Sequence, residues 1–237
     1  MRHGIAALSA ATLILPLLAG CAGAEHRRED AHGHGAAGTA GRHHRFEDAE
    51  EWARVFDADG RDEWQRPDHV LTFLDLPRDA KVADIGSSTG YFAVRFARAL
   101  PEGRVYGVDI EPNMDRYLRE RAVDEGLENL IGVLGLPDDP RIPEPVDLIF
   151  LCNTYHHIEG RAEYFAERRR DLLPGGRIAV VDYLPGDLPV GPPPAMKIAP
   201  EAVAEEMNQA GFRMVTRDGG LPYQYILLFE KSKDPGF

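Results

Sequence analysis

The chain has 237 residues, of which 43% are apolar, and this is enough for one sizeable α/β domain with a single core. Its formal net charge of −12 argues against a nucleic-acid backbone as the main partner, because that partner requires a basic face. The two cysteines, Cys21 and Cys152, predict no structural disulfide, since Cys152 lies inside an apolar run.

Residues 1–20 have the pattern of an export signal, with Arg2 and His3 before an apolar stretch that is short for a membrane span. Residues 18–21 read Leu-Ala-Gly-Cys, which resembles the lipobox of bacterial lipoproteins. The resemblance implies cleavage before Cys21, lipidation of Cys21, and export to the periplasmic or outer side of a bacterial membrane. The alternatives are ordinary cleavage after residues 22–24, an uncleaved anchor, or a cytoplasmic protein if the leader is not used.

Residues 21–45 are rich in glycine, alanine, histidine and charge, and they show no apolar periodicity. This composition predicts a tether. Its histidines could bind a transition metal, but their spacing matches no defined site, so we predict no metal centre. These histidines are His26, His32, His34, His43 and His44.

The domain proper is expected over residues 46–237, and it begins with helices within residues 46–75, at Glu47–Phe56 and Pro67–Leu74. Strands and helices then alternate. Strands are predicted at Val82–Ile85, Arg104–Asp109, Leu130–Leu134, Val146–Cys152 and Arg177–Tyr183. Helices are predicted between them, at Tyr91–Leu100, Pro112–Glu125 and Arg161–Leu172. This order predicts a doubly wound parallel sheet that binds its ligand at the carboxyl ends of its strands.

The C-terminal part predicts a helix at Pro200–Ala210 and two strands, Phe212–Arg217 and Tyr223–Phe229, joined by a turn at residues 218–220. Such a pair forms an antiparallel hairpin at the edge of a sheet. The predicted fold class is therefore α/β, with a mostly parallel sheet of seven strands.

The loop after the first strand, Asp-Ile-Gly-Ser-Ser-Thr-Gly at residues 84–90, fits two classes of enzyme. Its last five residues match the nucleophile elbow of α/β-hydrolases, with Ser88 as the nucleophile. Against this, the loop follows the first strand and the sequence has no histidine after His157. A dinucleotide-binding loop is also disfavoured, because Tyr91 stands where its third glycine is needed.

The loop resembles the first motif of class I S-adenosylmethionine-dependent methyltransferases, and the resemblance extends over about residues 46–231. It implies S-adenosylmethionine as the cofactor. Gly86 and Gly90 would let the backbone approach the methionine part, and Asp84 would orient its amino group. Ser88 replaces the family's usual middle glycine, which can adopt positive φ without strain.

Further residues are matched to the cofactor by the same resemblance. Asp109, at the end of the second strand, would accept hydrogen bonds from both ribose hydroxyls, which suits an acceptor-only carboxylate. Ile110 would lie beside the adenine, and Asn153 would face the reacting methyl group. Asp138 follows the third strand, where the family often has an acidic contact to adenine, but with Asp139 it would serve equally well as a turn.

The candidate catalytic cluster is Tyr155-His156-His157, just after the fourth strand, where methyl acceptors enter in this family. Either histidine could remove a proton from the acceptor, or one could simply pack beneath the loop. We expect methyl transfer to a small-molecule acceptor. The alternative is a membrane-tethered binding protein that keeps the fold without the transfer activity.

Overall fold

The computed structural model describes residues 49–58 and 60–233. The signal, Cys21 and the histidine-rich tether lie outside these residues. The described domain begins with α1 (Ala49–Phe56), α2 (Arg61–Gln65) and α3 (Pro67–Leu74). The predicted helix at Pro67–Leu74 is confirmed, whereas α2 was not predicted, because five residues between a glycine and a proline are too few to show helical periodicity.

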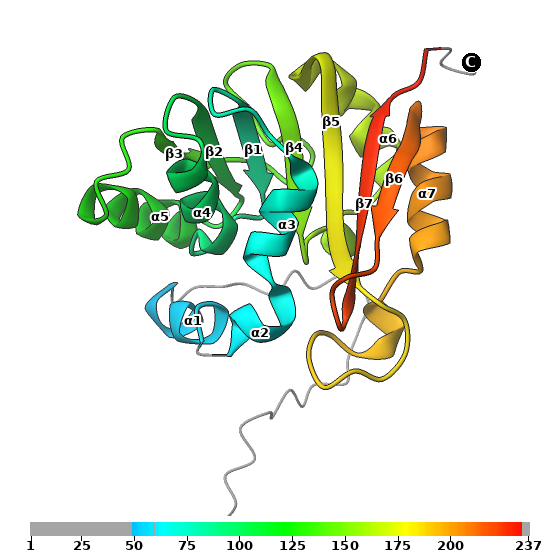
Figure 1. Ribbon diagram of the computed structural model, residues 1–237, viewed down its shortest axis with the longest axis horizontal. Helices are drawn as coiled ribbons and strands as arrows, with labels where there is room; N and C mark the ends of the chain where they lie inside the picture. The colour runs from blue at the N-terminus through cyan, green and yellow to red at the C-terminus, as the bar shows by residue number, and fades with distance from the viewer. Residues whose placement is uncertain (1–48, 59, 234–237) are drawn as a thin grey trace, which may run out of the picture. The chain divides into compact units, whose positions relative to one another are not determined.

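Seven strands form one sheet (Figure 1), as the sequence predicted. The strands are β1 (Lys81–Ile85), β2 (Arg104–Asp109), β3 (Leu130–Leu134), β4 (Val146–Cys152), β5 (Leu172–Tyr183), β6 (Phe212–Asp218) and β7 (Gln224–Lys231). Their order is β3-β2-β1-β4-β5-β7-β6. The first five are parallel, and β7 is antiparallel to both β5 and β6, so the predicted C-terminal hairpin is confirmed.

Helices cover both faces of the sheet, as a doubly wound fold requires. The remaining helices are α4 (Tyr91–Ala99), α5 (Pro112–Asp124), α6 (Arg161–Arg168) and α7 (Pro200–Gln209). Leu148 and Phe150 of β4 pack with α3, α4 and α5 on one face, and Ile149 and Leu151 pack with α6 and α7 on the other. Because the centre of β4 is buried on both faces, its sequence from Leu148 to Cys152 is a continuous apolar run.

The segment before the fifth strand differs from the prediction. The helix that was expected to continue to Leu172 ends at Arg168, and β5 begins at Leu172 after a single 3-10 turn, η2 (Arg169–Asp171). Val146 of β4 pairs with Leu172, but Leu148 pairs with Arg177. The Pro-Gly-Gly residues therefore form a bulge inside β5, where Gly175 has a φ of 80°.

Two segments far apart in sequence lie near the carboxyl ends of the parallel strands (Figure 1). One is α1 and α2, and the other is the loop that contains the 3-10 helix η3 (Pro194–Met196). In that loop Lys197 donates from Nζ to the carbonyl of Gly186 over 2.8 Å, which ties its two ends together. Within the described ranges no helix is both long and apolar enough to span a bilayer.

Candidate functional site

The glycine loop is a tight turn held against β2. The backbone N–H groups of Gly86 and Ser87 both donate to the carbonyl of Val108, over 2.8 and 3.0 Å. Gly86 has a φ of 76°, and a Cβ there would lie 2.2 Å from Oγ1 of Thr154. Glycine is therefore required at this position by backbone conformation and by space.

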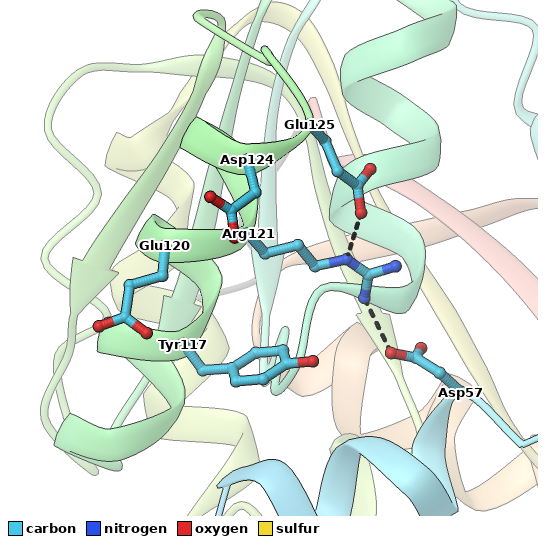
Figure 2. Close-up of a pocket in the computed structure, with 6 residues that line it drawn as sticks. All are labelled: Asp57, Tyr117, Glu120, Arg121, Asp124 and Glu125. Carbon is cyan, nitrogen blue, oxygen red and sulfur yellow. Dashed lines mark hydrogen bonds and ion pairs between the residues drawn. The ribbon is translucent and has the colours of Figure 1, made fainter.

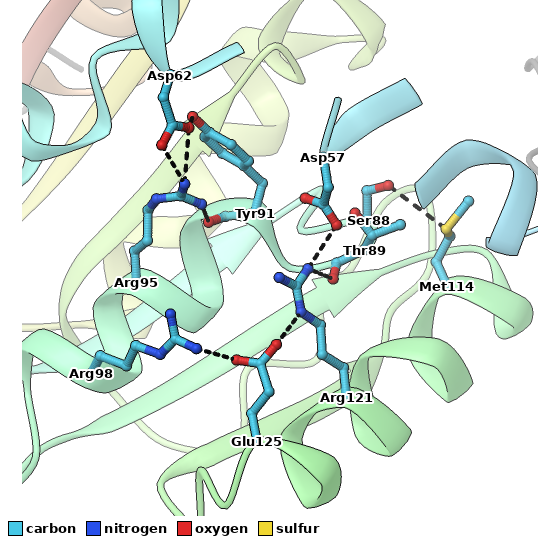
Figure 3. A network of polar contacts seen from close by, with 10 residues as sticks. All are labelled: Asp57, Asp62, Ser88, Thr89, Tyr91, Arg95, Arg98, Met114, Arg121 and Glu125. Atoms are coloured by element: carbon cyan, nitrogen blue, oxygen red, sulfur yellow. Dashed lines mark hydrogen bonds and ion pairs between the residues drawn. The ribbon is translucent and has the colours of Figure 1, made fainter. Parts of the chain in front are cut away.

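Ser88 adopts the left-handed conformation that glycine favours, with a φ of 50°. Its backbone N–H donates to Oδ2 of Asp109 over 2.9 Å, and its hydroxyl lies 3.7 Å from the sulfur of Met114 (Figure 3). The residue thus acts through its backbone, by joining the loop to the end of β2. This geometry suits a residue that replaces glycine beneath a ligand.

We expect Ser88→Gly to preserve ligand binding and to raise the unfolding free energy by up to about 1 kcal/mol, because glycine adopts positive φ without strain. Ser88→Leu should instead block binding, since a bulky side chain would project from the loop. Urea denaturation and calorimetric titration would check both variants. If a fluorophosphonate labels Ser88 and the label is lost in Ser88→Ala, this interpretation would be contradicted. Ser88 would then be the nucleophile of a hydrolase.

Two carboxylates lie below the loop, at the ends of β1 and β2. Asp84 is buried, at 3% exposure, and burial together with the negative charge of Asp109 raises its pKa to about 7. Burial also raises the pKa of Asp109, although the N–H groups of Glu111 and Ser88 oppose this by donating to its carboxylate. The pair therefore favours a cationic ligand, which would compensate the buried negative charge.

Asp109 is arranged to accept further hydrogen bonds. Its Oδ1 accepts from the backbone N–H of Glu111 over 3.0 Å, and its Oδ2 accepts from that of Ser88 over 2.9 Å. Each carboxylate oxygen has two lone pairs, so Asp109 can accept hydrogen bonds beyond those from the loop. Two neighbouring hydroxyl groups would match this pair of acceptors.

The short helix α2 brings a cation to the same site. The Arg61 guanidinium lies 3.7 Å from the centre of the Tyr91 ring, and its positive charge opposes the rise in the pKa of Asp84 that burial causes. Asp62, the next residue, accepts hydrogen bonds from the Tyr91 hydroxyl and from Arg95 (Figure 3). The sequence analysis missed Arg61 because it did not predict α2.

Arg121 joins α1, α5 and the glycine loop. It donates to Asp57, to Glu125 and to the carbonyl of Thr89, with distances of 2.9, 2.8 and 2.9 Å (Figures 2 and 3). Beside it is a cavity of about 340 Å³. Its lining residues are Asp57, Tyr117, Glu120, Arg121, Asp124 and Glu125, and none of the predicted cofactor-binding residues is among them. The Arg121 network therefore attaches the glycine loop to α5 through the carbonyl of Thr89.

The cluster after β4 folds as the 3-10 helix η1 (Tyr155–His157). Tyr155 is fully buried, stacks on Phe165 and donates to Glu206 of α7 over 2.8 Å. Tyr155 was predicted as a candidate catalytic residue, and in the structure its hydroxyl is engaged in packing α7 against η1. His157 is exposed, and its ring centre lies 4.2 Å from that of His156.

His156 is held by Asp182, the penultimate residue of β5. Its Nδ1 lies 2.9 and 3.0 Å from the two carboxylate oxygens, and the side chains are 2% and 1% exposed. A carboxylate can only accept, so Nδ1 carries a proton, and in the neutral ring Nε2 keeps its lone pair. This is the arrangement of an oriented base, although the same contact fastens η1 to β5.

Three other residues were predicted to bind the cofactor, and their surroundings differ from one another. Asp138 is exposed in a tight turn in which Leu136 and Asp139 exchange backbone hydrogen bonds, as the alternative interpretation expected. Ile110 is 40% exposed beside Asp109, and Asn153 follows β4 with a φ of 58°. The structure brings Asn153 to the same edge as the glycine loop, since its neighbour Thr154 lies against Gly86.

Comparison with known proteins identifies the fold. Residues 82–176 match the family described as a methyltransferase domain. A solved S-adenosylmethionine-dependent methyltransferase from Aquifex aeolicus superimposes with a TM-score of 0.71, at 24% identity, over 77% of this chain and 97% of that one. The domain has the fold of S-adenosylmethionine-dependent methyltransferases. A solved [4+2]-cyclase shares the fold at 16% identity, over 71% of this chain and 80% of the other, with a TM-score of 0.60.

Curated methyltransferases match by sequence. A tRNA U34 carboxymethyltransferase from Desulfotalea psychrophila is 32% identical over 139 residues, 56% of this chain and 42% of the relative. A ubiquinone/menaquinone biosynthesis C-methyltransferase from Cupriavidus metallidurans is 34% identical over 107 residues, which is 44% of this chain and 43% of the relative. The chain thus spans less than half the length of these relatives.

The residues of the methyltransferase fold described above fit this cofactor. The pair formed by buried Asp84 and partly buried Asp109 suits a ligand that carries a positive charge and two adjacent hydroxyls. The turn from Gly86 to Gly90 packs closely at its two ends, where a Cβ would lie 2.2 Å from Oγ1 of Thr154 and 2.4 Å from Cδ1 of Leu118. Asp84 would pair with the amino group, and Asp109 would accept from the ribose.

Proposed function

We propose that this protein transfers a methyl group from S-adenosylmethionine to a small-molecule acceptor. The observation that carries the proposal is Asp109, which ends β2 with a carboxylate held by backbone N–H groups, beside a glycine loop at positive φ. The family match over residues 82–176 supports the same activity. The test is calorimetric titration of the domain with S-adenosylmethionine and with S-adenosylhomocysteine. A folded protein that binds neither compound would overturn the proposal.

When bound, the cofactor supplies an electrophilic methyl group whose sulfonium sulfur keeps the electron pair as the bond to carbon breaks. The protein would contribute alignment and exclusion of water. At the end of β5 the ring of Tyr183 packs against the backbone of Gly191, so closely that a Cβ there would lie 2.5 Å from Cε1 of the ring. His156, oriented by Asp182, would take the acceptor's proton at Nε2 if it carries one.

A small molecule is favoured over RNA as the acceptor. One curated relative acts on tRNA by its name, and others act in quinone biosynthesis. The formal net charge of −12 opposes binding of a polyanion, because phosphate groups require a basic surface. Small acceptors have no such requirement.

A second candidate is a tethered binding protein without transfer activity. The fold alone does not fix a reaction, since a solved [4+2]-cyclase shares it. Binding of S-adenosylmethionine without methyl transfer to any of a panel of phenols, carboxylates and amines would favour this candidate.

We also propose that Cys21 is lipidated and anchors the protein to a bacterial membrane. The support is the Leu-Ala-Gly-Cys sequence after a short apolar stretch. We expect the full chain to incorporate a labelled fatty acid in a bacterial host and to sediment with membranes, whereas Cys21→Ser should not. A wild-type chain that takes up no label would exclude lipidation.

A further inference from the structure

Three amide side chains form a row of hydrogen bonds from α2 to the end of β4. Nε2 of Gln65 donates to Oε1 of Gln224, and Nε2 of Gln224 donates to Oδ1 of Asn153. Gln65 and Gln224 are both fully buried. The row therefore connects α2, through the first residue of β7, with the residue that follows β4.

Arg61 determines which amide group donates and which accepts in each hydrogen bond of this row. A guanidinium has donors only, and Nη2 of Arg61 donates to Oε1 of Gln65 over 3.3 Å. Gln65 must therefore turn its amino group toward Gln224. The same constraint passes along the row, since the opposite direction would place the amino group of Gln65 against the guanidinium.

The consequence appears at Asn153. Its Oδ1 is occupied by Gln224, whereas its amide nitrogen has no partner among residues 49–58 and 60–233. The backbone N–H of Asn153 donates to the carbonyl of Val181 over 2.9 Å, so the residue is fixed between β4 and β5. Asn153 is only partly buried, and it thus presents two N–H donors at the carboxyl edge of the sheet.

We propose that Asn153 donates a hydrogen bond to the methyl acceptor, and that the acceptor carries an oxygen lone pair there, as a phenolate, enolate or carbonyl does. The amide nitrogen of Asn153 cannot accept a hydrogen bond, and its Oδ1 already accepts one from Gln224, so this group matches an oxygen lone pair better than the N–H of an amine. Asn153 is then a specificity-determining residue, and Arg61, Gln65 and Gln224 are positioning residues. The inference rests on the proposed function.

The direction of the hydrogen bonds in the row can be tested without any methyl acceptor, by NMR measurement of hydrogen exchange at the side-chain amides. In the wild type the amide protons of Gln65 and Gln224 should exchange slowly and those of Asn153 fast; Asn153→Asp identifies the signal. Gln65→Glu cannot donate, so the row should reverse, and the Asn153 protons should exchange at least about tenfold more slowly. Glu63→Gln, exposed on the same helix, should change nothing.

The specificity is tested with a matched pair of probes that have the same shape, 4-nitrophenolate and 4-nitroaniline, above the pKa of the phenol. Bound to protein saturated with S-adenosylhomocysteine, the phenolate should have at least about tenfold higher affinity than the aniline. The neutral variant Gln224→Met removes the donor that occupies Asn153 Oδ1 and should reduce this ratio toward one. Retained binding of S-adenosylhomocysteine shows that the variants are folded.

Slow exchange of the Asn153 protons in the wild type, or no change in Gln65→Glu, would overturn the inference. A wild-type affinity ratio near one, a ratio unaffected by Gln224→Met, or no binding of the phenolate would do the same. Failure of the proposed function can be distinguished from failure of this inference. In the first case the folded wild-type protein would not bind S-adenosylhomocysteine.

Discussion

Asp109→Ala is expected to weaken binding of S-adenosylmethionine and S-adenosylhomocysteine by about 100-fold or more. The carboxylate would accept hydrogen bonds from both ribose hydroxyls, and each such bond to a charged group contributes about 1.5–3 kcal/mol. The change also leaves the N–H groups of Ser88 and Glu111 without their acceptor, so the loop would lose its attachment to β2. Calorimetric titration measures the affinity directly.

Two further variants separate these effects. Asp109→Asn keeps one acceptor oxygen, so its affinity should lie between those of the wild type and the alanine variant. Asp79→Ala removes an exposed carboxylate that lies before β1 and should bind the cofactor normally. Wild-type affinity in a folded Asp109→Ala protein would exclude the assigned contact with ribose.

Asp84 should make both stability and cofactor binding depend on pH. Its pKa is raised to about 7 in the folded protein by burial and by Asp109, so the folded state binds its proton more tightly than the unfolded state. The free energy of unfolding should therefore fall as pH rises from about 4 to about 7, by a few kcal/mol at most, and this contribution should be constant above that range.

Asp84→Asn removes this titration. At about pH 8 the variant should be more stable than the wild type by up to a few kcal/mol, and at about pH 4 the two should be equal. The cofactor's ammonium should favour ionised Asp84, so wild-type affinity should rise through pH of about 7, while the variant should bind weakly without that rise. Denaturation and titration at several pH values would measure both, and identical pH profiles would contradict the assignment.

The sheet could be predicted from sequence because its five parallel strands are apolar runs bounded by turns, and β4 is the clearest case. The end of the predicted helix at Leu172 was wrong, since nothing local marks the change from α6 to β5. The positions of Asp84 and Asp109 at strand ends were likewise readable from strand boundaries. Resemblance supplied their roles.

The rest of the site depends on contacts between distant segments. Gln65 and Gln224 are 159 residues apart, and an isolated glutamine in a sequence gives no sign that it will be buried beside another. Arg61 lies on a helix too short to show periodicity, and the burial of Tyr155 against Phe165 and Glu206 depends on elements that follow it in the chain. The burial and contacts of these residues depend on tertiary packing, which the local sequence does not reveal.

The position of β7 between β5 and β6 has a consequence for biosynthesis. β6 is synthesised before β7, and its only partner in the sheet is β7. During translation β6 is therefore an unpaired strand that carries the exposed side chains of Met214 and Val215, and β5 also has an open edge. A chain cut before Gln224 would expose both edges permanently, and such nascent or truncated chains are the forms most prone to aggregate.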